Sequence, residues 1–181
     1  MKNYLYIDGG YLSKVLESFS SQYFNSLPMV PNLKVLGSGY EKIFYYDCLP
    51  SKQQEESVED FKKRNERTVS FFELLESTDG FHMRTGALRG MGRRVRQKGV
   101  DVSIAVDMLS ASYRKAADRV FLLAGDLDFL PLVEELVREG MYITLWYEKA
   151  SASKDLVRAA DARRELTVLE SFWLCDESLK G

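Results

Sequence analysis

The sequence predicts an α/β fold in which a mainly parallel, doubly wound sheet is covered by helices. Short runs rich in β-branched and aromatic residues alternate with longer amphipathic stretches along the chain, which is the pattern of parallel βαβ units. Its 181 residues, 45% hydrophobic and 29% charged, suffice for one domain with a real core. No internal repeat or linker divides the chain, so residues 1–181 are expected to form a single domain.

In the first half of the chain, alternating and apolar runs predict strands and periodic charged segments predict helices. The expected strands are Lys2–Ile7, Glu41–Cys48 and Phe81–Leu88. The expected helices are Tyr11–Glu17 and a long one over Gln53–Glu76, with a break near Asn65 left open. Ser20–Gly39 contains two prolines and two glycines, so we expect a loop there, with room for a short helix.

The second half continues the alternation. The expected strands are 119–124, Met141–Tyr147 and Leu166–Leu169. The expected helices are Val100–Ala116, 128–139 with Gly140 as its stop, a segment through Ala160 capped by Ser151 or Ser153, and a short one in the tail.

The composition excludes several classes of protein. No run of about 18 apolar residues is present, so no membrane span is expected. The amino terminus resembles a strand rather than a secretory signal, which favours a cytoplasmic location. Cys48, Cys175 and His82 are too few for a structural zinc site. We expect two part-buried thiols and a structural histidine.

Three aromatic residues near the carboxyl end have two interpretations. Burial in the core is the favoured one, and a self-association patch, which leaves a homo-oligomer open, is the other. These residues are Trp146, Tyr147 and Trp173.

Charge is distributed unevenly, although the net charge is only −2. Between Arg84 and Val100 there is no acidic residue, while six basic ones occur: Arg84, Arg89, Arg93, Arg94, Arg96 and Lys98. Such a stripe is either a solvated surface or a binding site for a polyanionic backbone.

Acidic residues recur where strands end and helices begin. Asp8 follows the first strand, Asp126 and Asp128 follow the strand at 119–124, and Asp101 opens a helix after Gly99. Because the carboxyl ends of parallel strands meet at one edge of a sheet, Asp8 and Asp126 are expected to be neighbours, and Asp101 can face the same edge. The plainer interpretations are helix caps for Asp101, Asp126 and Asp128 and a turn for Asp8.

Asp107 lies six residues after Asp101, so on a helix the two side chains point about 120° apart. Its plainer interpretation is a solvated acid or a partner of Arg114.

Clustered carboxylates with no nearby His or Cys favour a hard cation such as Mg²⁺ or Mn²⁺. An acidic metal site beside a basic arm is the arrangement expected of a metal-dependent nuclease. Asp-x-Asp after a strand also occurs in phosphatases and in nucleotide-sugar chemistry. The other motifs of the haloacid dehalogenase phosphatases are absent from the expected positions.

Three segments of the sequence resemble the motifs of NYN domains, in the PIN-like nuclease superfamily, and most of all the bacterial LabA-like (DUF88) branch. They are Tyr6–Leu12 (YIDGGYL), Gln97–Val102 (QKGVDV) with Ala105 and Asp107, and Ala124–Leu132 (AGDLDFLPL). The resemblance spans residues 4 to about 169. It implies a PIN-like, Rossmann-like three-layer α/β/α sandwich, a Mg²⁺ or Mn²⁺ site, and RNA, single-stranded by preference, as substrate.

The resemblance also implies roles for individual residues. Asp8, Asp101 and Asp126 would be the central catalytic and metal-binding acids, with Asp128 and Asp107 supporting them. Lys98 would lie beside the metal site and contact phosphate. Independently of the resemblance, the acid-free basic stretch beside these acids predicts that Arg93, Arg94 and Arg96 hold the RNA. Many family members have Asn where this sequence has Tyr11, which leaves two functions open: an endoribonuclease, or a weakly active or inactive RNA-binding regulator.

Overall fold

The computed structural model describes residues 1–49, 53, 55–86, 99–168 and 172–175. Within these ranges the chain forms a six-stranded sheet of order β4-β3-β1-β5-β6-β7, in which every pairing is parallel. Its strands are β1 (Asn3–Asp8), β3 (Lys42–Asp47), β4 (Phe81–Thr85), β5 (Arg119–Leu123), β6 (Tyr142–Tyr147) and β7 (Ala162–Glu165). A separate antiparallel pair joins β2 (Met29–Pro31) to β8 (Trp173–Cys175).

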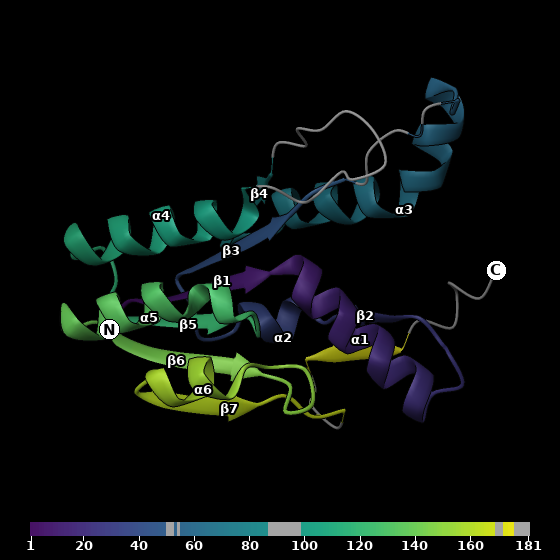
Figure 1. Cartoon of the computed structure of the whole chain (residues 1–181). Helices are drawn as coiled ribbons and strands as arrows, with labels where there is room; N and C mark the ends of the chain where they lie inside the picture. The colour runs from purple at the N-terminus through teal and green to yellow at the C-terminus, as the bar shows by residue number, and fades with distance from the viewer. Residues whose placement is uncertain (50–52, 54, 87–98, 169–171, 176–181) are drawn as a thin grey trace.

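Helices cover both faces of the sheet (Figure 1). One face packs against α1 (Gly9–Tyr23), α2 (Leu33–Gly37) and α3 (Val58–Ser77). The other packs against α4 (Val100–Tyr113), α5 (Leu130–Arg138) and α6 (Lys154–Ala159), and the short 3₁₀ turn η1 (Leu127–Phe129) precedes α5. The apolar residues of each strand alternate between two buried clusters, one on each face. The predicted three-layer α/β/α architecture is confirmed.

The strand order places a topological switch point between β1 and β5. From β1 the chain proceeds outward to β3 and β4 through helices on one face, whereas from β5 it proceeds to β6 and β7 through helices on the other. The loops that follow β1 and β5 therefore diverge, and a crevice opens between them at the carboxyl ends of the strands. In open α/β sheets this crevice is the usual ligand site.

Most of the predicted elements occur where the sequence places them, and the long helix α3 is unbroken. Asn65 is buried inside it, where its Nδ2 donates to the Phe61 carbonyl at 2.8 Å. Residues 20–39 are more ordered than predicted, because α1 continues to Tyr23 and β2 follows it.

The prediction of a last strand at 166–169 is wrong for its described residues. The strand is β7, at Ala162–Glu165, and Leu166 is instead a buried core residue whose amide donates to Tyr147 at 2.7 Å. Charged residues are tolerated in β7 because it is an edge strand: the Arg164 guanidinium lies 4.9 Å from the centre of the Trp146 ring. In the tail, where a short helix was predicted, the described residues contain β8.

The predicted burial is confirmed for Trp146, Trp173 and Cys48, whereas Tyr147 is half-buried. The burial of Cys175 lies outside what the structure describes. His82 is exposed on β4 with its ring stacked on Phe44, in line with a structural role. Over the described ranges, no helix is both long and apolar enough to cross a membrane.

Candidate functional site

Four carboxylates from four different segments line one small hollow at the switch point. We call it the acidic hollow; its volume is about 120 Å³. It is lined by Asp8, Gly10, Tyr11, Lys14, Asp47, Val100, Asp101 and Asp126. The fold therefore brings together three of the predicted acids and adds Asp47.

Asp8 ends β1 and caps α1. Its Oδ1 accepts a hydrogen bond from the amide of Tyr11 at 3.0 Å, so Asp8 is a helix cap and not the turn acid of the plainer interpretation. Burial above all, with the nearby charges of Asp101 and Asp47, raises the pKa of Asp8 to about 6, against the lowering effect of hydrogen bonds from backbone amides. A cation in the hollow would favour the ionised form of a half-buried acid that has two acidic neighbours.

Asp47 was missed by the sequence analysis. It ends β3, which pairs with β1 in parallel, and it accepts from the amide of Cys48 at 2.7 Å. Gly9 permits the close approach, because a Cβ on Gly9 would stand 2.8 Å from Asp47 Oδ2. Burial raises the pKa of Asp47. The signal was available, since Asp47 follows an apolar run in the same way as Asp8.

Asp101 lies in the first turn of α4 but does not cap it. The N-cap is Gly99, which has φ +108° and no side chain, so the cap interpretation of Asp101 is wrong. Burial raises the pKa of Asp101, and the charges of Asp126 and Asp128 raise it further. Its carboxylate is thus free to face the hollow.

Asp126 and Asp128 differ in role. Asp126 is the N-cap of η1 and accepts from the amide of Asp128 at 3.1 Å, and it also lines the acidic hollow. Asp128 is exposed and lies outside the lining of the hollow. The cap is therefore Asp126, and Asp128 acts on the site through its charge.

Asp107 lies apart from the other acids. It lines a different hollow, between α4 and β4, where Arg84 Nε is 3.5 Å from Asp107 Oδ2. The Tyr46 hydroxyl donates to the same carboxylate at 2.7 Å. The partner predicted for Asp107 was Arg114, and this is wrong, because β4 rather than the end of α4 supplies the cation.

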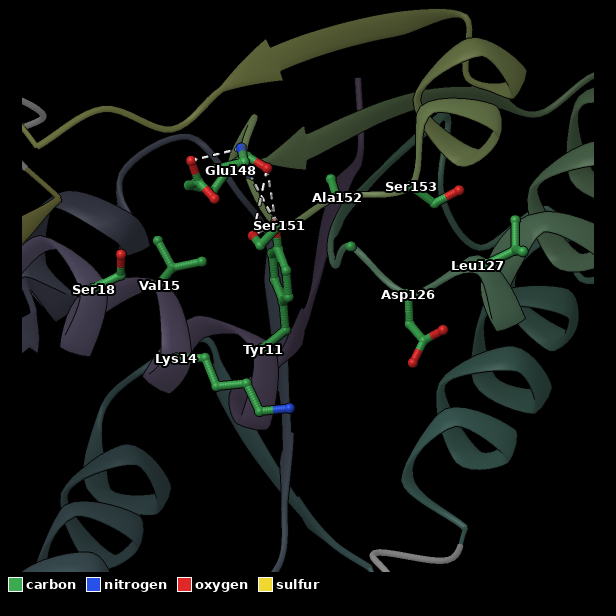
Figure 2. Close-up of a pocket in the computed structure, with 12 residues that line it drawn as sticks. Tyr11, Lys14, Val15, Ser18, Asp126, Leu127, Glu148, Ser151, Ala152 and Ser153 are labelled. Atoms are coloured by element: carbon green, nitrogen blue, oxygen red, sulfur yellow. Dashed lines mark hydrogen bonds between the residues drawn. The ribbon is translucent and has the colours of Figure 1, made fainter.

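Tyr11 closes one side of the acidic hollow. Its ring packs directly on Gly125, where a Cβ would stand 2.8 Å from the Tyr11 hydroxyl oxygen and closer still to the ring. The hydroxyl accepts from the amide of Glu148 at 2.9 Å and lies 3.1 Å from Ser151 Oγ (Figure 2). Tyr11 therefore joins the start of α1 to the loop between β6 and α6.

Lys14, also unpredicted, lies one turn after Tyr11 on α1. Figure 2 shows its amine and the Asp126 carboxylate reaching into the same space. The predicted RNA-binding residues Arg93, Arg94, Arg96 and Lys98 lie outside the described residues.

The donor set fits a hard cation, but the carboxylates do not form a closed metal cage. Within the described ranges, no three His, Cys, Asp or Glu side chains are grouped closely enough to hold a metal ion. The four acids that line the hollow nevertheless offer only oxygen atoms, which are the ligands that Mg²⁺ and Mn²⁺ prefer. Burial is the main cause of the raised pKa values of Asp8, Asp47 and Asp101, and neighbouring carboxylates add to it at Asp8 and Asp101.

The parallel sheet, its flanking helices and its acidic switch point define an α/β protein with a PIN-like fold. The model of the NYN domain matches residues 1–167. The chain therefore belongs to the NYN domain family, which is part of the PIN-like nuclease superfamily.

A crystal structure of a protein of unknown function from Vibrio parahaemolyticus RIMD 2210633 has the same fold. Its TM-score is 0.67 at 18% sequence identity, and the alignment covers 96% of both chains. No curated protein matches the chain.

Proposed function

We propose that this protein is a single-domain, metal-dependent endoribonuclease of the LabA-like (DUF88) branch of the NYN family. The observation that supports this proposal most directly is the acidic hollow, where Asp8, Asp47, Asp101 and Asp126 meet at the switch point of the sheet. These residues would hold Mg²⁺ or Mn²⁺, with Asp128 adding negative charge nearby. The family membership supports a nucleic acid as the substrate.

The bound ion would orient a water for attack on a phosphodiester and stabilise the leaving oxygen. The chain's own residues prepare the site for this task. Asp8 is fixed by the amide of Tyr11, and Asp126 by the amide of Asp128. Since each carboxylate is fixed by backbone, its direction is set before the ion or the RNA arrives.

The test is to incubate labelled single-stranded RNA with Mn²⁺ and either the wild type or Asp126→Asn. Asn retains a cap oxygen for η1, so the variant should fold while losing a charged ligand. We expect cleavage by the wild type, its loss in EDTA, and a severe loss in the variant. Equal cleavage by the two proteins would show that the acidic hollow is not the catalytic site.

A second candidate is an RNA-binding or regulatory protein without turnover. Two points favour it. The NYN motif that the sequence resembles often has a polar Asn where this chain has Tyr11, and the acids of the described residues are not grouped as a closed metal site. This function predicts salt-dependent RNA binding with no cleavage in Mn²⁺. It fails if Asp126→Asn abolishes function in cells while its RNA binding is retained.

A further inference from the structure

Two larger hollows adjoin the acidic hollow, one on each side of α1. The loop-side hollow, of about 550 Å³, lies between α1, the Gly125–Leu127 turn and the β6–α6 loop. The α3-side hollow, of about 780 Å³, lies between α1, the segment around β2, the end of β3, and α3. The loop-side hollow shares Tyr11, Lys14 and Asp126 with the acidic hollow, and the α3-side hollow shares Gly10, Lys14 and Asp47 with it.

The three volumes suit different parts of a polynucleotide. Pockets for small organic ligands are typically about 300–1,000 Å³, a range that includes both flanking hollows but not the acidic hollow of about 120 Å³. The central space therefore suits a phosphate group or an ion, and each flanking space suits a nucleotide. This alternation matches a sugar-phosphate chain that passes over α1.

Lys14 lines all three hollows. In the described part of the chain it forms no ion pair, although Asp8, Asp47 and Asp126 line the central hollow with it. A lysine amine that is exposed and uncommitted at such a junction is placed to contact a backbone phosphate. Its neutralising effect is also greatest there, since the surrounding acids would otherwise repel the RNA.

The walls of the flanking hollows combine apolar side chains with serine hydroxyls and a few charged groups. The serines that line them are Ser13, Ser18, Ser20, Ser21, Ser26, Ser151 and Ser153. Arg67 adds a second cation at the α3 side, where Phe71 supplies an apolar wall. Glu17 and Glu148 also line these hollows, so positive charge is concentrated at Lys14 and Arg67 rather than spread along the whole path.

We propose that the three hollows form one track for single-stranded RNA across the first turns of α1. A backbone phosphate occupies the acidic hollow beside Lys14, and the adjoining nucleotides occupy the two flanking hollows, with Arg67 contacting the chain on the α3 side. Only unpaired nucleotides can enter the two hollows separately. This inference rests on the proposed function, and it adds the path of the substrate and two residues that bind it.

The test measures RNA binding apart from cleavage. All proteins carry Asp126→Asn, and a fluorescent single-stranded 20-nucleotide RNA is titrated by anisotropy in Mg²⁺ at several salt concentrations. Lys14→Ala should weaken binding by roughly tenfold and reduce the log–log salt slope by about 0.7, the value for one phosphate contact on a single strand. Lys14→Arg should retain most of the affinity. Arg67→Ala should act in the same direction as Lys14→Ala.

Lys2→Ala is the matched control. Lys2 is exposed at the amino end of β1, at the opposite edge of the sheet, and it lines none of the three hollows. Lys2→Ala removes the same charge as Lys14→Ala but at a site away from the hollows. Its RNA affinity and salt slope should therefore equal those of the parent protein. A duplex of the same sequence should bind more weakly than the single strand to the parent protein.

Two results would overturn the track: unchanged binding in Lys14→Ala, or a loss in Lys2→Ala as large as in Lys14→Ala. The cleavage assay with the wild type separates this inference from the proposed function. Cleavage in Mn²⁺ together with Lys14-independent binding would retain the nuclease and remove the track. Lys14-dependent binding without cleavage would retain the track and remove the nuclease.

Discussion

Two acids on the same helix have opposite environments. Asp107, on α4, lies 3.5 Å from the Arg84 guanidinium and accepts a hydrogen bond from the Tyr46 hydroxyl at 2.7 Å. Asp101, six residues earlier, has a pKa raised by burial and by the charges of Asp126 and Asp128. The charge of Asp107 is compensated by Arg84, whereas Asp101 forms no ion pair with another residue of the described ranges.

The difference separates a structural acid from a site that requires a ligand. A compensated carboxylate holds α4 against β3 and β4, and its removal affects the fold. Uncompensated carboxylates in one hollow are costly to keep ionised, so they indicate an external cation. Both the acidic hollow and the hollow beside Asp107 contain aspartate. They differ in whether a cation of the protein lies beside the carboxylate.

The largest expected effect is on catalysis. Asp101→Asn should reduce Mn²⁺-dependent RNA cleavage by roughly 10²–10⁴-fold, since a metal ion supplies several kcal/mol of transition-state stabilisation. Asp107→Asn, on the same helix, should change the rate by less than about threefold, because it lies in a different hollow. Single-turnover rates on one labelled RNA measure both. A comparable loss in the two variants would contradict the division into a structural acid and a functional one.

The next effect is on stability and depends on pH. Asp8 has its pKa raised from 3.8 to about 6, so its contribution to stability is fully present below about pH 4 and is lost as the pH rises through 6. In EDTA, Asp8→Asn should therefore be more stable than the wild type at pH 7, by at most about 3 kcal/mol, and the gain should vanish near pH 4. Denaturant unfolding at both pH values measures it.

Bound metal should make the wild type more stable than Asp8→Asn at pH 7. Mn²⁺ should raise the melting temperature of the wild type, through preferential binding to the folded state, and should raise that of Asp8→Asn less. Equal unfolding free energies for the two proteins at pH 7 in EDTA would show that the ionised Asp8 carboxylate does not destabilise the folded state.

A smaller effect concerns the packing beside the acidic hollow. Gly125→Ala should cost about 1–3 kcal/mol, because its Cβ would overlap the Tyr11 ring and force α1 or the Asp126 turn to move. Thermal unfolding measures the loss, and the cost of Gly125→Ala should be much smaller when it is measured in a Tyr11→Ala background, where the overlap is absent. Failure of the second change to compensate would locate the strain elsewhere.

The smallest effect belongs to the compensated pair. Arg84→Ala should cost no more than about 1 kcal/mol, because the Arg84 side chain is 55% exposed and the Asp107 side chain 32%, and such surface pairs are weak. The loss should shrink in high salt. Urea unfolding at two salt concentrations measures it, and a cost that does not depend on salt would point to packing rather than charge.

Local pattern predicted much of this molecule. Apolar runs predicted five of the six strands of the main sheet. Four of these, β1, β3, β5 and β6, are interior strands, and a parallel strand covered on both faces requires apolar residues. The same logic failed at β7, where Arg163 and Arg164 mark an edge strand and the apolar Leu166 after it fills the core. An edge strand is not required to be apolar, so the composition of β7 did not predict a strand.

By itself, the sequence determined which acids stand at strand ends and helix starts, since Asp8, Asp101 and Asp126 follow from local pattern alone. Only the tertiary structure decided which of them meet, and it added Asp47 through the pairing of β3 with β1 and Lys14 through the packing of α1. It also gave Asp107 a cation from β4. Charge compensation depends on contacts between segments that are distant in the chain, and local periodicity does not predict those contacts.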